Sequence, residues 1–337
     1  MTPPTTAVAP GRSSAPRSSG RRGLAAASLL QRQGAAAVLG LLVVVAWLAF
    51  PRFGTVDNLR DIALQSSFLA VIALGMTFVI ITGGIDLSVG SVYALGGVLA
   101  AYGSQAGPVA AIVLPLAVCG LIGLVNGVLV ARTGMAPFIV TLAALLFARG
   151  LLLALTAEGS TTYTISDPVV LALGRGTILG LGNPVWIAVV LFLLGGLLLN
   201  RTRFGQNLLA TGGAETSAVL MGLPVARTKI IAYTMSGLLA GFAGVLTAAY
   251  LQSGVTVIGV GTELDAIAAV VIGGTLLAGG AGTVLGTAVG VGLRSVIQNV
   301  INQIGGLDSN YQSVISGVFL LVVVVVQRSL TRARPRR

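Results

Sequence analysis

The feature that most constrains this chain is the near absence of charge over long stretches. Between Asp61 and Arg132 only Asp86 is charged, and between Lys229 and Glu263 nothing is. Apolar runs of about 18 or more residues are typical of helices that cross a bilayer. The composition agrees, because only 9% of residues are charged, against roughly a quarter in soluble domains. The sequence therefore predicts an all-α polytopic membrane protein.

Apolar segments recur along the chain between polar or glycine-rich loops. They lie at about 35–50, 62–82, 89–104, 108–131, 137–156, 184–200, 230–251, 265–278, 282–303 and 311–327. We expect about ten transmembrane helices in one domain at 35–330. The similar segments IITGG at 80–84 and VVIGG at 270–274 suggest a weak internal repeat of two halves, as in transporters built from repeats.

The basic residues gather at the two ends of the chain. Of the 20 Lys and Arg residues, five lie in 1–34 and five in 328–337, and neither end contains an acid. Basic residues beside apolar spans stay in the cytoplasm, where they meet anionic lipid. We therefore expect a disordered basic arm at 1–34, a basic tail at 331–337, both termini in the cytoplasm, and no binding of nucleic acid.

The composition removes most enzymatic chemistry. The chain has no His and one Cys, Cys119, which lies in an apolar run. The sole lysine, Lys229, follows Thr228 and fits no phosphate-binding loop of the G-x-x-x-x-G-K-[ST] type. We expect no catalytic residue, no metal site and no cofactor in this chain, so any energy must come from another subunit.

An isolated carboxylate stands in the segment 83–90, which reads GGIDLSVG. A charge at the centre of a bilayer helix costs about 2.5 to 3.5 kcal/mol on insertion scales, so Asp86 should avoid lipid. The two preceding glycines should break the helix, leaving Asp86 as N-cap of the next one or in contact with substrate or a gate. The candidate residues for a translocation path or helix break are Gly83, Gly84, Asp86, Ser88, Gly273 and Gly274.

Two further carboxylates, Glu263 and Asp265, stand at the start of the apolar segment ELDAIAAVVIGG at 263–274. Acids in a first helical turn interact favourably with the helix dipole. Without a nucleophile or a His nearby, acid and base catalysis has no support. We expect these two side chains at an outer entrance, where they cap the helix or contact a binding protein.

The longest inward loop, 201–229, is expected to contain a short helix at about 214–221. This helix would expose apolar side chains that need a partner, although a plain solvated loop is the alternative. The candidate residues for docking this partner are Ala214, Glu215, Val219, Leu220, Met221 and Gly222.

Together, GGIDLSVG at 83–90, RTRFG at 201–205 and ELDAIAAVVIGG at 263–274 resemble the permease subunits of bacterial ABC sugar importers of the ribose type. The resemblance covers about residues 35–330. The run GGTLLAGGAGTVLGT at 273–287 is most similar to the second permease of the galactofuranose importer.

This resemblance implies a half-pore in the bacterial inner membrane that moves a monosaccharide, such as ribose, galactofuranose or another pentose or hexose, into the cytoplasm. Its partners would be a sugar-binding protein, an ATPase that holds ATP and Mg²⁺, and a second permease in a homodimer or heterodimer. The helix at 214–222 would be the coupling helix. The alternatives are an ABC permease for another solute such as an amino acid, and an ion-coupled secondary transporter.

Overall fold

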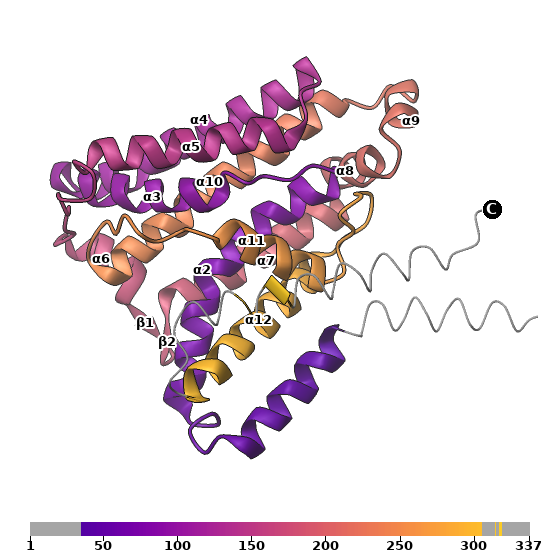
Figure 1. Ribbon diagram of the computed structural model, residues 1–337. Helices are drawn as coiled ribbons and strands as arrows, with labels where there is room; N and C mark the ends of the chain where they lie inside the picture. The colour runs from indigo at the N-terminus through magenta and orange to yellow at the C-terminus, as the bar shows by residue number, and fades with distance from the viewer. Residues whose placement is uncertain (1–34, 305–313, 315–316, 319–337) are drawn as a thin grey trace, which may run out of the picture.

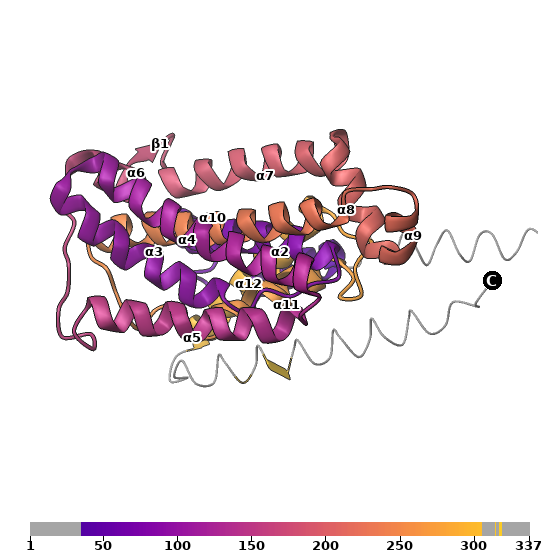
Figure 2. The same cartoon turned by 90° about the horizontal axis from the view of Figure 1, so that it is seen from above.

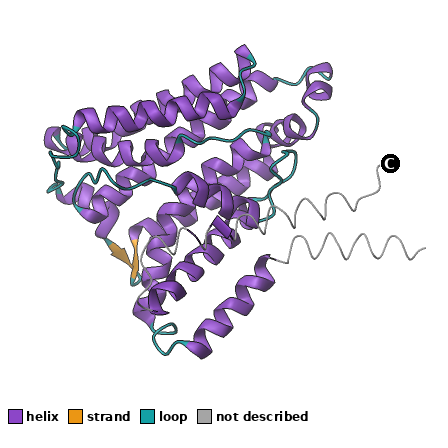
Figure 3. Ribbon diagram, viewed as in Figure 1, coloured by secondary structure: helices purple, strands orange, loops and turns teal. Residues whose placement is uncertain are grey.

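The computed structural model describes residues 35–304 and the separate positions 314, 317 and 318, and this part of the chain is mainly helical (Figures 1 and 3). Six of the described helices are long and apolar enough to cross a membrane. They are α2 (Val56–Ile81), α4 (Pro108–Thr133), α5 (Pro137–Leu155), α7 (Asn183–Arg201), α10 (Val225–Leu251) and α12 (Val284–Ile304). The predicted all-α polytopic architecture is confirmed.

The expected count of ten spans is not confirmed. Three of the predicted segments form shorter helices, namely Ala35–Ala49, α3 (Val89–Gly103) and α11 (Thr262–Ile272). The predicted segment 265–278 ends early, because the chain leaves the helix at Gly273. The segment 311–327, the basic arm 1–34 and the tail 331–337 lie outside the described residues, apart from the three isolated positions.

Several short elements were not expected from the sequence. The connection after α5 contains α6 (Pro168–Arg175), whose N-cap Asp167 accepts hydrogen bonds from two backbone N–H groups, and a hairpin of β1 (Thr177–Ile178) and β2 (Leu181–Gly182). The 3₁₀-helix η1 (Ser104–Ala106) joins α3 to α4. The loop after α7 forms α8 (Arg203–Gly213) and α9 (Glu215–Leu220), which lie at the opposite end of the bundle from α6 and the hairpin (Figure 2).

Helix α10 is the centre of the bundle and packs on α2, α3 and α4. Its small residues allow this approach: a Cβ on Gly237 would lie 2.4 Å from the carbonyl oxygen of Cys119, and one on Gly244 would lie 2.2 Å from that of Tyr93. Helices α11 and α12 meet in the same way at Gly290, where a Cβ would lie 1.9 Å from the carbonyl oxygen of Ala269. Backbone contact at small residues is how helices associate where lipid provides no hydrophobic drive.

Candidate functional site

The segment 82–88 interrupts the helical structure between α2 and α3. Helix α2 ends at Ile81, the chain turns at Gly83 with a φ of +83°, and α3 begins only at Val89. A positive φ of this size favours glycine, because it has no Cβ. The seven residues between the two helices therefore form an irregular segment, in which Thr82, Gly84, Asp86 and Ser88 are buried in the protein and Gly83 is exposed.

Asp86 lies within this break and is 1% exposed. Its carboxylate accepts hydrogen bonds from the backbone N–H of Ser88 at 3.0 Å, from the Ser88 hydroxyl at 2.6 Å and from the Ser236 hydroxyl of α10 at 2.8 Å. The Ser88 hydroxyl also accepts from the side-chain amide of Asn126 on α4 at 3.1 Å. The carboxylate thus ties the break to the central helix, and its partner Ser88 ties it to α4.

The expectation that Asp86 is the N-cap of α3 is wrong. Ser88 occupies the N-cap position, and its own side chain caps no backbone N–H. Asp86 stands two residues earlier and reaches the Ser88 N–H across a local turn, a hydrogen bond typical of Asp before a helix. Direct contact between Asp86 and a substrate stays a prediction.

The second Gly–Gly pair also ends a helix. Helix α11 stops at Ile272, and Gly274 has a φ of +92°. A Cβ on Gly273 would lie 2.2 Å from the carbonyl oxygen of Gly286, so α12 crosses α11 at this point. The internal repeat that these similar endings suggest stays a prediction.

The two breaks meet at a junction of glycine backbones. The N–H of Gly280, beyond the second break, donates to the carbonyl of Ile81 at 2.9 Å. A Cβ on Gly279 would lie 2.7 Å from the nitrogen of Gly83, and a Cβ on Gly212 would lie 1.8 Å from the Ile81 oxygen. We call Gly83, Gly212, Gly213, Gly279 and Gly280 the glycine junction. It joins the end of α2, the turn after α11 and the end of α8.

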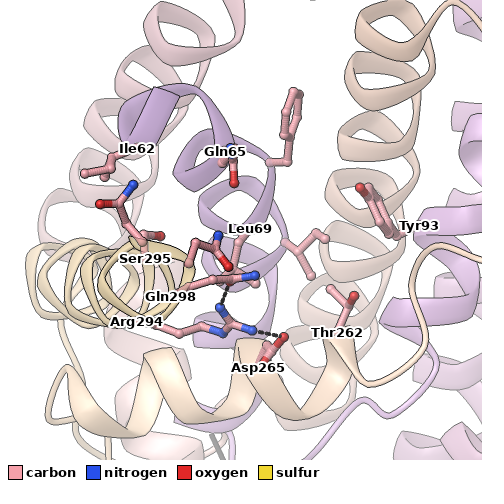
Figure 4. Close-up of a pocket in the computed structure, with 13 residues that line it drawn as sticks. Ile62, Gln65, Leu69, Tyr93, Thr262, Asp265, Arg294, Ser295 and Gln298 are labelled. Atoms are coloured by element: carbon pink, nitrogen blue, oxygen red, sulfur yellow. Dashed lines mark hydrogen bonds and ion pairs between the residues drawn. The ribbon is translucent and has the colours of Figure 1, made fainter. Parts of the chain in front are cut away.

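A cavity of about 260 Å³ lies between α2, α3, α11 and α12 (Figure 4). The cavity lies along the first half of α2, near the β-hairpin, where Leu64 lies against Gly182. The glycine junction lies at the other end of α2. The cavity is lined by Ile62, Gln65, Phe68, Leu69, Ile72, Tyr93, Thr262, Asp265, Arg294, Ser295, Gln298, Asn299 and Asn302. Most of these side chains are polar, which is uncommon inside an apolar bundle.

The two acids of α11 have different surroundings. Asp265 lines the cavity and forms an ion pair with Arg294 of α12 at 2.5 Å. Glu263 lies against α3, where a Cβ on Gly90 would be 2.2 Å from its carboxylate. Nearby, the guanidinium of Arg149 on α5 donates to the carbonyl of Thr256 at 2.8 Å, which fixes the loop that precedes α11. Both acids lie in the first turn of α11, as predicted.

The predicted short helix of the 201–229 loop is present as α9. Ala214 is its N-cap residue, and Gly222, with a φ of +75°, follows its end. The side chains of Val219, Leu220 and Met221 are exposed, and Leu220 reaches 83%. Helix α8, which the sequence did not predict, runs through the glycines at 212 and 213, so only one residue separates α9 from the glycine junction.

Glu215 of α9 pairs with Lys229 of α10 at 2.6 Å, which fastens the short helix to the bundle. Beside it lies an open groove of about 500 Å³, lined in part by Val219, Arg132 and Arg227. Exposed apolar side chains next to basic ones are suited to docking another protein. In the described part of the chain, no three His, Cys, Asp or Glu side chains gather in a way that could hold a metal ion.

Sequence reasoning missed the polar face of α12. Residues 294, 295, 298, 299 and 302 recur at helical spacing and all line the cavity. Asn299 also exchanges two amide hydrogen bonds with Asn58 of α2, at 2.8 and 3.2 Å. The sequence signal for this polar face is the recurrence of Gln and Asn residues within 282–303. An analysis of charged residues alone overlooks it.

A polytopic helical bundle with discontinuous helices, a cavity lined mainly by polar side chains and an exposed apolar helix at one end has the architecture of a transport protein. The chain belongs to the family described as branched-chain amino acid transport system / permease component, which matches residues 58–324.

The chain is 41% identical over 312 residues to the ribose import permease protein RbsC of Escherichia coli (strain K12), which covers 91% of this chain and 97% of that protein. It is 41% identical to the inner membrane ABC transporter permease protein YjfF of the same strain, over 87% of this chain and 90% of the relative. It is 38% identical to the L-arabinose ABC transporter permease protein AraH of Azospirillum brasilense, over 88% of this chain and 87% of that protein. No solved structure gives a significant match.

These relatives are permease subunits, so the resemblance to ribose-type ABC permeases is confirmed. The chain is accordingly a multi-pass membrane transport subunit and not an enzyme. The narrower similarity to a galactofuranose permease stays a prediction.

Proposed function

We propose that the chain forms half of the pore of an ATP-driven importer that carries a monosaccharide into the cytoplasm. The observation that carries this proposal is the 41% identity to a ribose import permease over almost the whole of both chains. The polar cavity inside the bundle supports it, because a sugar needs hydrogen-bonding groups along an otherwise apolar path. Ribose, arabinose, galactofuranose and other pentoses or hexoses are the candidate cargoes.

Three kinds of partner complete the transporter. A sugar-binding protein would deliver cargo at the outer entrance that Glu263 and Asp265 are expected to mark, and a second permease, identical or homologous, would form the other half of the pore. An ATPase holding ATP and Mg²⁺ would dock on α9, whose exposed apolar side chains support this role. In this proposal the loop 201–229 and both termini lie in the cytoplasm of a bacterial cell, next to its inner membrane.

The glycine junction suggests how ATPase movement would reach the pore. Helix α8 connects α9 directly to the end of α2 and to the turn after α11, where backbones touch without intervening side chains. Closely packed backbone transmits displacement because it has no side-chain rotamers to absorb it. Movement of α9 would thereby shift the end of α2 and the turn after α11 together.

The test is transport by the complete importer. The chain should be co-reconstituted with its ATPase and loaded binding protein in proteoliposomes containing ATP, and labelled D-ribose, L-arabinose, D-galactose and L-leucine compared. We expect uptake of a sugar that requires ATP and survives a protonophore. Uptake of leucine alone would establish an amino-acid permease, and uptake abolished by the protonophore would establish a secondary transporter; either result would refute the proposal.

A further inference from the structure

The open groove beside α9 lies where three segments of the chain meet at one end of the bundle (Figure 1). Its lining comes from the last turn of α4, from Val219 of α9, and from residues between 223 and 230, where α10 begins. Arg132 and Arg227 are the two charged residues of the lining, and all the others are apolar. The groove therefore combines two cations with a hydrocarbon-like surface.

Neither of these arginines has a partner within the described part of the chain. No ion pair or side-chain hydrogen bond there involves the guanidinium of Arg132 or Arg227, and both residues are exposed. No acid lines the groove, and Glu215 of the adjacent α9 is already paired with Lys229 at 2.6 Å. Two like charges that share one groove are stabilised by an anion between them. A cationic ligand group would find no partner in this groove.

An apolar stripe along α4 leads to Arg132. Leu121, Val125 and Val128 precede it at helical spacing, so they share its face of the helix. Leu121 and Val125 are exposed, and α4 is long and apolar enough to cross a membrane, so this face is suited to contact with lipid hydrocarbon. An Arg at the end of such a span lies at the level of the lipid headgroups.

Helix α10 brings Arg227 to the same level. Because the groove receives the end of α4 and the start of α10, the two helices are antiparallel neighbours. They touch close to the groove, where a Cβ on Gly127 would lie 2.8 Å from the Cα of Ile230. This backbone contact fixes the two helix ends relative to each other, so Arg132 and Arg227 line a preformed site.

We propose that this groove binds one anionic phospholipid, of the phosphatidylglycerol type, from the leaflet that surrounds this end of the bundle. The phosphate accepts hydrogen bonds from both guanidinium groups, which match phosphate oxygens in geometry and charge. An acyl chain lies against the apolar lining and the stripe of α4. Basic pockets between membrane helices on the cytoplasmic side are typical sites for anionic headgroups. Phosphatidylethanolamine binds less well, because its ammonium group meets no acid in the groove.

The lipid site goes beyond the proposed function and is independent of which solute the permease carries. It also leaves the proposed ATPase dock accessible. Leu220 and Met221, the most exposed apolar side chains of α9 and its C-cap, do not line the groove. A bound lipid therefore covers Val219 and leaves those two side chains for a protein partner.

Native mass spectrometry of the full-length permease measures lipid binding directly. The protein in lipid-free detergent is titrated with phosphatidylglycerol, phosphatidylethanolamine or phosphatidylcholine of identical acyl chains, and we expect one phosphatidylglycerol to be retained in preference to the other two. Each Arg beside an anionic lipid contributes roughly a fivefold gain in affinity, so the double variant Arg132→Gln, Arg227→Gln should bind it roughly tenfold to thirtyfold more weakly.

The matched control is the double variant Arg201→Gln, Arg203→Gln. It removes the same charge where α7 meets α8, outside the groove, and should bind phosphatidylglycerol like the wild type. The basic ends of the chain are present in every variant, so their contribution to lipid binding cancels. Equal affinities of the two double variants, or no preference of the wild type for phosphatidylglycerol, would overturn the proposal.

The melting temperature separates a lipid from other occupants of the groove. Phosphatidylglycerol should raise it for the wild type and the control variant but not for the groove variant, since a ligand stabilises only a protein that binds it. A similar rise with millimolar inorganic phosphate or glycerol 3-phosphate would make the groove a site for soluble phosphate. If the groove variant retained the lipid but lost the ATPase in a pull-down, the groove would belong to the protein dock. Each of these two outcomes would refute the lipid site.

Discussion

Replacement of Asp86 tests whether the first helix break is held by its buried carboxylate. Asp86→Ala leaves the Ser88 N–H and the hydroxyls of Ser88 and Ser236 without their present acceptor. An unsatisfied buried N–H costs about 1 to 3 kcal/mol and each lost hydroxyl bond about 0.5 to 1.5 kcal/mol, hence roughly 2 to 6 kcal/mol in total. Asp86→Asn keeps one acceptor oxygen for Ser88, and its NH₂ can donate to Ser236, so it should lose much less.

Thermal unfolding of the purified permease in detergent measures this ranking. We expect the melting temperature to fall clearly for Asp86→Ala and only slightly for Asp86→Asn. Asp57→Ala is the matched control, because that carboxylate is 92% exposed and forms only a surface pair with Arg60 at 3.6 Å. A wild-type melting temperature for Asp86→Ala would refute the structural role. If both variants instead melted normally but failed in uptake, Asp86 would be a substrate-contacting residue.

Three further predictions address topology, docking and the glycine junction. In a Cys119→Ser background, Thr161→Cys should react with an impermeant maleimide in spheroplasts, whereas Ser217→Cys should react only in inside-out vesicles. The reverse labelling would show that the proposed orientation is inverted. Leu220→Asp should leave the permease inserted but abolish pull-down of the ATPase, since a carboxylate would be buried unpaired in the interface, and unchanged binding would remove α9 as the dock. Gly212→Ala should destabilise by about 1 to 3 kcal/mol and uncouple ATP hydrolysis from uptake, because its Cβ would meet backbone at 1.8 Å. Gly150→Ala, where nothing lies within 4 Å, is the control, and equal behaviour of the two variants would contradict the role of the junction.

The sequence predicted that the protein is a polytopic membrane protein, and it indicated where several helices end. Absence of charge identified the apolar segments, and the Gly–Gly pairs marked where α2 and α11 end. The exposed side chains of α9 followed from apolar residues within a polar loop. These features depend on neighbours in sequence, so local patterns contain the required information.

Features that depend on contacts between distant segments could not be predicted from the sequence. Ser88 and not Asp86 is the N-cap of α3, and the Asp86 carboxylate also accepts a hydrogen bond from Ser236, 150 residues away in the sequence. The contact of Gly212 with Ile81 likewise requires α8 to fold back onto the bundle. Glycine frequency indicates that backbones approach closely somewhere, but the partner of each glycine is set by tertiary packing.

The polar face of α12 shows why the cavity was overlooked and how such sites can be found. In a soluble helix the polar face points to water, so a stripe of amides needs no explanation. In a membrane helix the same stripe faces lipid only at considerable cost, and it is therefore expected to line a protein interior or an aqueous path. The stripe containing Ser295, Asn299 and Asn302 meets this condition by facing α2 across the cavity. Amide periodicity within an apolar segment thus indicates a polar cavity between helices, whereas a search for isolated charges found Asp86, which lines neither of the two cavities described above.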